Sequence, residues 1–486
     1  MKEESAVEKA ERALAEFRRE LMAVAPDAVD LLAVEARVLE LARGWGAAAM
    51  AQAMKRADTE APEIVARGER WGNRRVQKQT YETMFGDVVL ERSTYQKGGG
   101  GRVLIPMDLR LGIVEGRYTP RMGRVLTKAV ALMPEAEAED FLREVGVAMV
   151  SKSTLHRIPR SIAARYETKR EVIEEAIRQR DPIPQMAVTV QVSLDGVMVP
   201  QDGEYARPRG RKTQSPQPAR HEKRYGPVGG DEPPADKDQS FGRSWHEGGV
   251  GTIAYFDAEG TRLKTTYFGR MPEPQKATLV AQLEQELRTV VDQSPAINVQ
   301  FASDGAAVQW NALNAMRKRL PDSFRGHAMM LLDFYHAAEY VQDAANAICG
   351  EGSADAKVLA VQWSETMKHC DDGACTVLKA MRYRRDKMPN GKDRAMVETS
   401  IKFLAKQHRR GRMKYTEAQQ RKYPIGTGVT EAAAKTVVNV RMKRAGARFS
   451  QHGGQTVMLF RTAILSQRFD LLHEELHASY TAPVAA

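Results

Sequence analysis

The stretch from Met186 to Asp333 constrains the fold most, because its hydrophobic pattern switches between the periods of strands and helices. Period-two segments (MAVTVQVSL, VGTIAYFD and LKTTYFG) come first, and a helical segment, the strand INVQFAS, a second helical segment and the strand HAMMLLD follow. Two or three antiparallel strands followed by alternating helices and strands are typical of a mixed α/β sheet. We therefore expect an α/β core here.

At 486 residues the chain exceeds one ordinary compact domain, so several units are expected. The pattern predicts a helical region at 1–70 as a candidate for dimerisation, a β-ribbon at 71–118, a helix-turn-helix-like DNA-binding region at 119–183, the first part of the core at 184–349, an all-helical insertion at 350–420, a final core helix at 421–450, and a C-terminal helix with a tail at 451–486. Residues 201–248 are rich in Pro, Gly, Arg, Lys and Gln, which predicts a flexible loop within the core.

The helix-turn-helix prediction depends on three consecutive helical segments, the third being SKSTLHRIPRSIAARYE. Ser151 or Ser153 can cap this helix, and its first turns then expose basic side chains. The candidates for DNA binding are Lys152, Arg157 and Arg160. An ordinary three-helix packing unit fits the same pattern equally well.

Composition narrows the class of partner and the compartment. The chain has 73 Lys and Arg against 62 Asp and Glu, a net charge of +11, which favours a polyanionic partner without proving one. No stretch approaches the ~20 apolar residues of a membrane span, and Met1–Ala23 is charged and amphipathic, unlike a signal peptide. Three cysteines form no zinc-ribbon pair. We expect a cytoplasmic protein with reduced thiols and no membrane partner.

Two acidic residues directly follow predicted strands. Asp195 lies on the polar side of the alternation in the first strand, just after its predicted end. Asp304 follows INVQFAS at the carboxyl edge, where α/β sheets collect ligands. Each precedes a glycine, and a single Asp-Gly dipeptide is most often only a turn. It is the pair that indicates a site.

Glu431 is the third acidic candidate. It lies in a helix predicted over 429–445, where it shares a stripe with Ala434, Val438 and Met442 and so faces packed structure. The alternative is an ordinary ion pair with Lys435 one turn further on. The spacing alone does not separate the two interpretations.

Three carboxylates at one sheet edge are what two divalent ions about 3.5–4 Å apart require. Hard oxygen ligands select Mg²⁺, with Mn²⁺ as a substitute, and zinc is not indicated. The metal ligands would be Asp195, Asp304 and Glu431.

A further pair follows the strand HAMMLLD. Asp333 is an alternative metal ligand to Asp304, and His336 lies three residues on, at the start of a helix. The structural alternative is that Asp333 caps the helix while His336 is half-buried. We keep both residues as candidates beside the site or near the DNA.

Several segments of the sequence resemble a known family. The segments LDGVMVP, SDGA, LLDFYHAAEYV, YPIGTGVTEAAAKTVVNVRMKRAGARFS and GGQTVMLFRTAILSQRFD resemble insertion-sequence transposases of the ISKra family, relatives of the mutator-like group. The resemblance covers about 120–475. It implies a ribonuclease-H-like core whose acidic triad is Asp195, Asp304 and Glu431, and it matches the Asp-x-x-His element of mutator-like enzymes at Asp333 and His336. The β-ribbon departs from related transposases, because it lacks their zinc-type cysteines.

The resemblance and the residues together predict a DDE transposase of a bacterial insertion sequence. It would hydrolyse a phosphodiester at the transposon end and join the freed 3′-hydroxyl to target DNA, acting on double-stranded DNA as a homodimer or higher oligomer. The predicted phosphate contacts near the site are Arg441, Lys443, Arg444 and Arg448, although cations there also compensate a helix dipole. The alternatives are a domesticated, non-catalytic DNA-binding regulator and a nuclease that cleaves without strand transfer.

Overall fold

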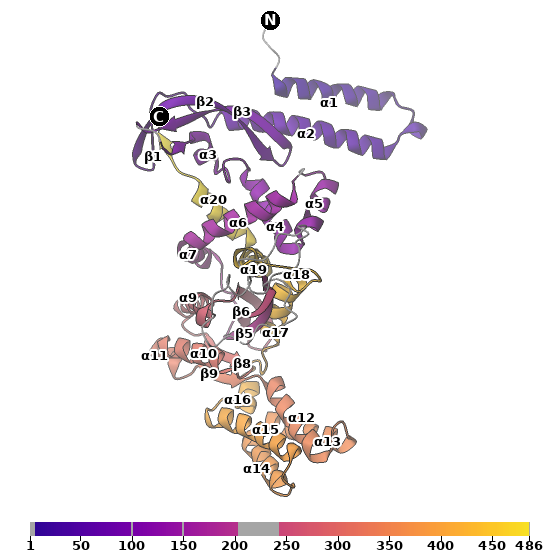
Figure 1. The fold of residues 1–486 in the computed structure, drawn as a ribbon, viewed down its shortest axis with the longest axis vertical. Helices are drawn as coiled ribbons and strands as arrows, with labels where there is room; N and C mark the ends of the chain where they lie inside the picture. The colour runs from indigo at the N-terminus through magenta and orange to yellow at the C-terminus, as the bar shows by residue number, and fades with distance from the viewer. Residues whose placement is uncertain (1–4, 99–100, 148–149, 203–242, 486) are drawn as a thin grey trace, which may run out of the picture. The chain divides into compact units, whose positions relative to one another are not determined.

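The computed structural model describes residues 5–98, 101–147, 150–202 and 243–485 (Figure 1). The chain is a mixed α/β protein with two sheets, which confirms the expected class. It divides into two compact units, one formed by Met1–Ile177 with Phe469–Ala486 and the other by Arg178–Arg468. Among the described residues, none of the helices combines the length and the apolar character needed to cross a membrane.

Unit 1 begins with two helices, α1 (Ala6–Ala23) and α2 (Leu31–Lys55), separated by a short 3-10 turn (Pro26–Ala28). Ser5 caps α1, because its hydroxyl accepts from the backbone N–H of Glu8 while the Glu8 carboxylate accepts from that of Ser5. No residue of α1 is buried, whereas α2 buries Leu41, Gly46 and Met54.

The first sheet has the order β10-β1-β2-β3-β4. Its strands are β1 (Ile64–Ala66), β2 (Glu69–Thr83), β3 (Gly86–Gln96), β4 (Val103–Leu104) and β10 (Val484–Ala485). The ribbon therefore starts before residue 71, within the segment expected to be helical. Arg67 and Gly68 have positive φ angles of 54° and 76°, which make the tight turn that joins β1 to β2.

Helices complete unit 1: α3 (Pro106–Leu111), α4 (Pro120–Leu132), α5 (Glu135–Glu144), α6 (Lys152–Thr168), α7 (Arg170–Arg180), which runs on into unit 2, and α20 (Phe469–Tyr480). The expected three consecutive helices are present as α4, α5 and α6, and Ser151 caps α6 by accepting from the N–H of Thr154. Instead of one C-terminal helix, the chain has α19 (Gln451–Leu465) in unit 2 and α20 in unit 1, because Gln467 turns the backbone with a φ of 59°.

His473 on α20 makes the stability of unit 1 depend on pH. Its Nε2 lies 2.9 Å from Thr127 Oγ1, and burial, aided by the charge of Arg124 and opposed by Asp470, lowers its pKa to about 3. The unfolded chain binds a proton near pH 6.5 and the folded chain does not, so stability falls as the pH falls through 6.5. Between pH 7 and 5 we expect unit 1 to lose about 1–2 kcal/mol.

This loss is measured by scanning calorimetry of the full chain at the two pH values. His473→Gln keeps a polar partner for Thr127 but takes up no proton, so it should remove most of this pH dependence. His477→Gln, at an exposed histidine on the same helix, is the matched control. An equal pH dependence in the wild type and in His473→Gln would contradict this account.

Unit 2 is built on a sheet of order β7-β6-β5-β8-β9. The strands are β5 (Thr189–Asp202), β6 (Arg243–Phe256), β7 (Arg262–Arg270), β8 (Asn298–Ser303) and β9 (Met329–Leu332). β5, β6 and β7 are antiparallel neighbours, whereas β8 is parallel to β5 and β9 is parallel to β8. Strand structure reaches into both ends of the expected loop 201–248, and the rest of that loop lies outside the described residues.

Both faces of this sheet are covered. The apolar face (Val190, Val192, Leu194, Ile253, Phe301) packs against α9 (Ala277–Gln293) and α10 (Ala307–Arg319) through residues such as Leu283 and Trp310. The other face is polar in its centre and meets α17 (Gly428–Ala433), the π-helix Ala434–Asn439, α18 (Val440–Met442) and α19. The polar face is therefore buried as well, with Gln191 and Ser193 each 1% exposed.

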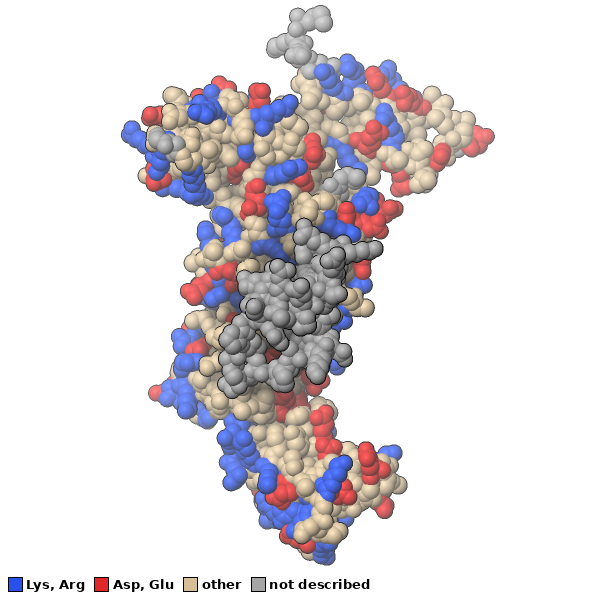
Figure 2. All heavy atoms as spheres, in the orientation of Figure 1, with Lys and Arg blue, Asp and Glu red and all other residues tan. Residues whose placement is uncertain are grey.

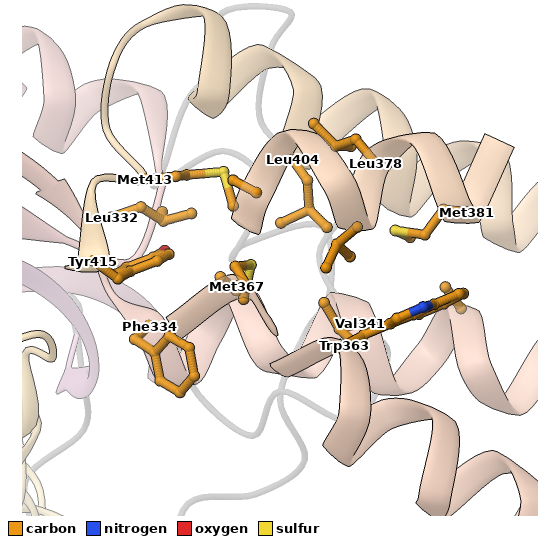
Figure 3. Packing of buried hydrophobic residues seen from close by; sticks show 14 of the residues in the cluster. Leu332, Phe334, Val341, Trp363, Met367, Leu378, Met381, Leu404, Met413 and Tyr415 are labelled. Carbon is orange, nitrogen blue, oxygen red and sulfur yellow. The ribbon is translucent and has the colours of Figure 1, made fainter. Parts of the chain in front are cut away.

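A helical lobe lies between β9 and α17, and it begins with α12 (Phe334–Cys349), before the insertion predicted at 350–420. It consists of α12, α13 (Ala354–His369), α14 (Gly373–Asp386), α15 (Lys392–Arg409) and α16 (Tyr415–Gln420). Its core gathers Val341, Trp363, Met367, Leu378, Met381 and Leu404 from the four longer helices (Figure 3). Leu332, Phe334 and Tyr415 continue this core to the edge of the sheet.

A buried ionic network joins the first and last parts of unit 2. The guanidinium of Arg468 donates to both carboxylate oxygens of Glu286, with Nη1 to Oε2 at 2.9 Å, and its Nε donates to Asp181 Oδ2 at 2.5 Å. Lys264 Nζ donates to Asp181 Oδ1 at 2.6 Å. The side chains of Arg468, Asp181 and Glu286 are 11%, 12% and 5% exposed, so the two carboxylates depend on Arg468 for their neutralisation.

Candidate active site

The structure brings Asp195 and Asp304 together at neighbouring strands. Ser193 on β5 is the register partner of Ala302 on β8, and these strands are parallel. Two residues further along each chain come Asp195 and Asp304, which therefore lie side by side on one face where β8 ends. The prediction that Asp195 lies at the end of its strand is wrong, because β5 runs on to Asp202 and pairs Asp195 with Val250 of β6.

Gln309 on α10 connects these two carboxylates. Its Nε2 donates to Asp195 Oδ1 at 3.3 Å, and its Oε1 accepts from Ser303 Oγ at 2.7 Å. Ser303 Oγ also lies 3.2 Å from Asp304 Oδ1, which accepts from the N–H of Ala306 as well. Gln309 and Ser303 are 3% and 0% exposed, so this bridge is rigid and orients both acids.

The charges of Asp304 and Glu431 act on the pKa of Asp195. Burial, the charge of Asp304 and, less strongly, that of Glu431 raise the pKa of Asp195 to about 6, against hydrogen bonds from the Gly196 N–H (2.6 Å) and Gln309. In agreement with this, α17, which carries Glu431, packs against both β5 and β6.

Glu431 occupies the first turns of α17, over the polar face of the sheet. The hydroxyls of Thr430 and Thr252 on β6 are 2.7 Å apart, and Thr252 is the register partner of Ser193, which shares a face with Asp195. The Glu431 side chain is exposed rather than packed, in contrast to the expectation. Within the described chain it forms no ion pair with Lys435, so the structure does not support the simple ion-pair alternative.

The helix that carries Glu431 is not a continuous α-helix. It runs from Gly428 to Met442, shorter than the predicted 429–445 at its C-terminal end, and its central residues Ala434–Asn439 form a π-helix. A π segment shifts the faces before and after it relative to one another, and such segments are frequent at functional sites. Val438 and Met442 are fully buried, while Glu431, on the preceding turn, is free to face the sheet edge.

Asp333 fixes the position of this helix. One of its oxygens caps α12 by accepting from the N–H groups of Tyr335 (2.7 Å) and His336 (3.2 Å). The other accepts from the N–H of Thr427 (2.6 Å) and from the Thr427 hydroxyl. Asp333 is 2% exposed and both oxygens are engaged, so it is a positioning residue rather than a third metal ligand. It holds Thr427, which lies four positions before Glu431.

Two glutamines inside the sheet hold the same segment. Gln191 Nε2 donates to the carbonyl of Gly426 at 3.3 Å, and Gln300 Nε2 donates to that of Pro424 at 2.9 Å. Neither residue was identified from the sequence. The available signal was a polar amide in the middle of each buried strand, because such a group must find a hydrogen-bond partner there.

His336 lies in an aromatic cluster beside Asp304. Its Nδ1 is 2.9 Å from Glu339 Oε2, and its ring meets those of Tyr340 and Phe403 edge to face. Tyr340 and Phe403 are stacked with centroids 4.0 Å apart. Burial raises the pKa of Tyr340, and Asp304 contributes to that rise after Asp343 and Glu339. His336 is half-buried, as the structural alternative expected.

The predicted basic contacts fall into three groups. Lys443, Arg444 and Arg448 are exposed just after α18, whereas Arg441 is only 2% exposed, with its guanidinium carbon 5.4 Å from the Phe449 ring centroid. A buried Arg441 is placed to stabilise the helix and not to contact phosphates. Lys152, Arg157 and Arg160 lie in unit 1 on α6, where Lys152 and Arg157 are exposed and burial lowers the pKa of Arg160.

The chemistry of the acidic side chains fits a hard divalent cation, since carboxylate oxygens are the ligands that Mg²⁺ prefers. Burial, followed by the charge of Asp304, raises the pKa of Asp195, and a bound cation would offset both effects. Over the described ranges, however, no group of three or more His, Cys, Asp or Glu side chains is arranged to hold one ion.

No protein-family model matches this chain, and no curated protein shows a significant match to it. The arrangement of Asp195, Asp304 and Glu431 is therefore the basis on which a function is assigned.

Proposed function

We propose that this protein is a DNA transposase that cleaves transposon ends and joins them to target DNA with a two-metal Asp-Asp-Glu site. The observation that carries the proposal is that Asp195 on β5 and Asp304 at the end of β8 lie side by side, while α17, which carries Glu431, packs on the same sheet through Thr430 and Thr252. This arrangement involves residues 236 positions apart in the sequence, from Asp195 to Glu431.

The order of the strands supports a ribonuclease-H-like core. Three antiparallel strands in succession, followed by two strands parallel to the first, give the order β7-β6-β5-β8-β9. The resemblance to ISKra-family transposases implies this type of sheet, with a helical insertion before the last acidic residue. The lobe α12–α16 occupies that place in the chain.

The chain's own residues would bind and orient the reacting groups. Asp195, Asp304 and Glu431 would hold two Mg²⁺ ions, and Gln309 and Asp333 would keep them in position. When bound, the ions would lower the pKa of the attacking water or 3′-hydroxyl and stabilise the leaving oxygen. Lys443, Arg444 and Arg448 would contact the DNA phosphates and set the distance of the scissile bond from the acids.

The test incubates the full chain with a labelled transposon end, a target plasmid and Mg²⁺, with EDTA as the control. We expect cleaved ends and end–plasmid joints that require the metal, with Mn²⁺ able to replace Mg²⁺. Cleaved ends without joints would make the protein a nuclease that lacks strand transfer. DNA binding without any cleavage would make it a non-catalytic regulator, and either result would overturn the proposal.

A further inference from the structure

The positive charge of this chain is concentrated in one segment of the inserted helical lobe, from the middle of α14 through α15 to the start of α16. Residues 379–414 contain thirteen Lys and Arg against three Asp and Glu, a net charge of +10 in 36 residues, compared with +11 for the entire chain. The rest of the chain is thus close to neutral. Figure 2 shows Lys and Arg side chains on the visible face of the lobe formed by α12–α16.

Within this segment the cations form a row along α15. Its exposed positions at alternating intervals of three and four residues are Lys392, Ala395, Thr399, Lys402, Lys406 and Arg409. We call the four cations among them the basic stripe. No acidic residue lies on it, and the opposite side of the helix is buried through Val397, Ile401 and Leu404. At 1.5 Å per residue the stripe extends over about 25 Å.

The middle of α15 contacts the candidate active site. Phe403 follows Lys402, and a Cβ on Gly305, the residue after Asp304, would come within 2.7 Å of the Phe403 ring. Phe403 stacks on Tyr340, whose pKa responds to the charge of Asp304. One helix therefore carries both a contact to the acidic site and the row of cations.

Little of the charge on the basic stripe is neutralised within the described part of the lobe, where Lys392, Lys406 and Arg409 form no ion pair. Lys402 approaches one carboxylate, Glu398, at 3.8 Å, while its side chain stays 74% exposed. Cations in the last turn of α15 also offset the helix dipole, but Lys392 and Lys402 lie outside that turn.

We propose that the basic stripe of α15 binds the phosphate backbone of the DNA duplex that enters the candidate active site. A straight row of cations without interspersed acids matches a duplex, which presents about one negative charge per 1.7 Å of its axis. The identity of the DNA as a transposon end rests on the proposed function, whereas the electrostatic binding does not. The insertion then acts as a clamp that holds the duplex next to Asp304.

The test compares two triple variants of the full chain with the same loss of charge. The first is Lys402→Gln, Lys406→Gln and Arg409→Gln on the basic stripe. The second is Arg262→Gln, Lys318→Gln and Lys357→Gln, at exposed positions elsewhere in unit 2. Binding of a labelled DNA duplex is measured in EDTA by fluorescence anisotropy between 50 and 300 mM salt, so that cleavage does not interfere.

We expect the stripe variant to reduce the slope of log affinity against log salt by about 2.7, since each phosphate contact contributes about 0.9. At 0.1 M salt its affinity should fall about 10²- to 10³-fold, while the control triple changes it less than about threefold. Lys406→Gln alone, the smallest of these changes, should lower the DNA affinity roughly eightfold. Equal losses in both triples, or an unchanged stripe variant, would overturn the proposal.

Two further measurements separate this inference from the proposed function. If the wild type binds DNA through the basic stripe but neither cleaves nor joins it, the proposed transposase function is wrong and the DNA-binding role of the stripe is retained. If the stripe variant binds DNA as tightly as a wild type that cleaves normally, the DNA-binding role of the stripe is wrong and the proposed function is retained. An RNA duplex bound more tightly than DNA through the same residues would show that the partner is RNA and overturn the clamp for DNA.

Discussion

Glu431→Gln should cleave a labelled transposon end at least about 10³-fold more slowly than the wild type, while DNA affinity and melting temperature stay nearly unchanged. The substitution keeps the size of the side chain and the helix propensity but removes the charge that a divalent ion requires. Because Glu431 is exposed and makes no ion pair within the described residues, its loss has no structural reason to destabilise the fold. The rate is measured with saturating Mg²⁺.

Lys435→Ala is the matched control for Glu431→Gln. It lies one turn further along the same chain segment and is also exposed, so it removes a charge of the opposite sign without touching the acidic site. We expect near-normal cleavage by Lys435→Ala. Comparable damage from both substitutions, or normal cleavage by Glu431→Gln, would contradict the three-carboxylate assignment, and Asp333 offers no replacement because both of its oxygens are already engaged.

Arg468→Met should destabilise unit 2 by about 3–5 kcal/mol, the largest effect on stability that we expect from one substitution. The change leaves the buried carboxylates of Asp181 and Glu286 without their common cation, and only Lys264 remains on Asp181. Desolvation makes such a charge far more costly than an exposed one. The effect is measured by chemical denaturation of the full chain, followed through the transition of unit 2.

The control and the rescue use the same network. Arg288→Met removes an exposed partner of Glu284 at 3.0 Å, where the arginine side chain is 50% exposed, and should cost less than about 1 kcal/mol. Adding Asp181→Asn and Glu286→Gln to Arg468→Met removes the buried charges and should recover part of the lost stability. A loss below about 1 kcal/mol for Arg468→Met would show that water or a rearrangement neutralises the carboxylates.

Many elements of unit 2 follow from the hydrophobic pattern, because α9 and α10 each bury one face, whereas β8 and β9 are short runs that are buried almost throughout. The length of β5 does not follow from the sequence pattern. Asp195-Gly196 has the composition of a turn, yet the chain continues as a strand to Asp202. The turn signal was overridden by pairing with β6, along which Gly196 pairs with Gly249. Local composition does not contain that pairing.

The candidate site was only partly predictable for a similar reason. Asp304 follows from the end of a strand, and Asp195 follows from the polar side of the alternation along β5, both of which are local patterns. The exposure of Glu431 depends on how α17 packs on the strands β5 and β6, and the role of Asp333 depends on Thr427, which is 94 residues away in the chain. Contacts over such separations leave no periodic signal, so the sequence predicted that Glu431 faces packed structure and kept Asp333 open as a metal ligand.

The insertion also determines when the acidic site is completed during protein synthesis. Asp195 and Asp304 leave the ribosome first, and 127 further residues must be added before Glu431 is made. At 5–20 residues per second this takes about 6–25 s. Through that interval the sheet lacks α17, and the amides of Gln191 and Gln300 have no carbonyl partners on the segment before it. A nascent chain therefore carries Asp195 and Asp304 but not Glu431, so under the proposed function it has no complete site until the insertion has been made.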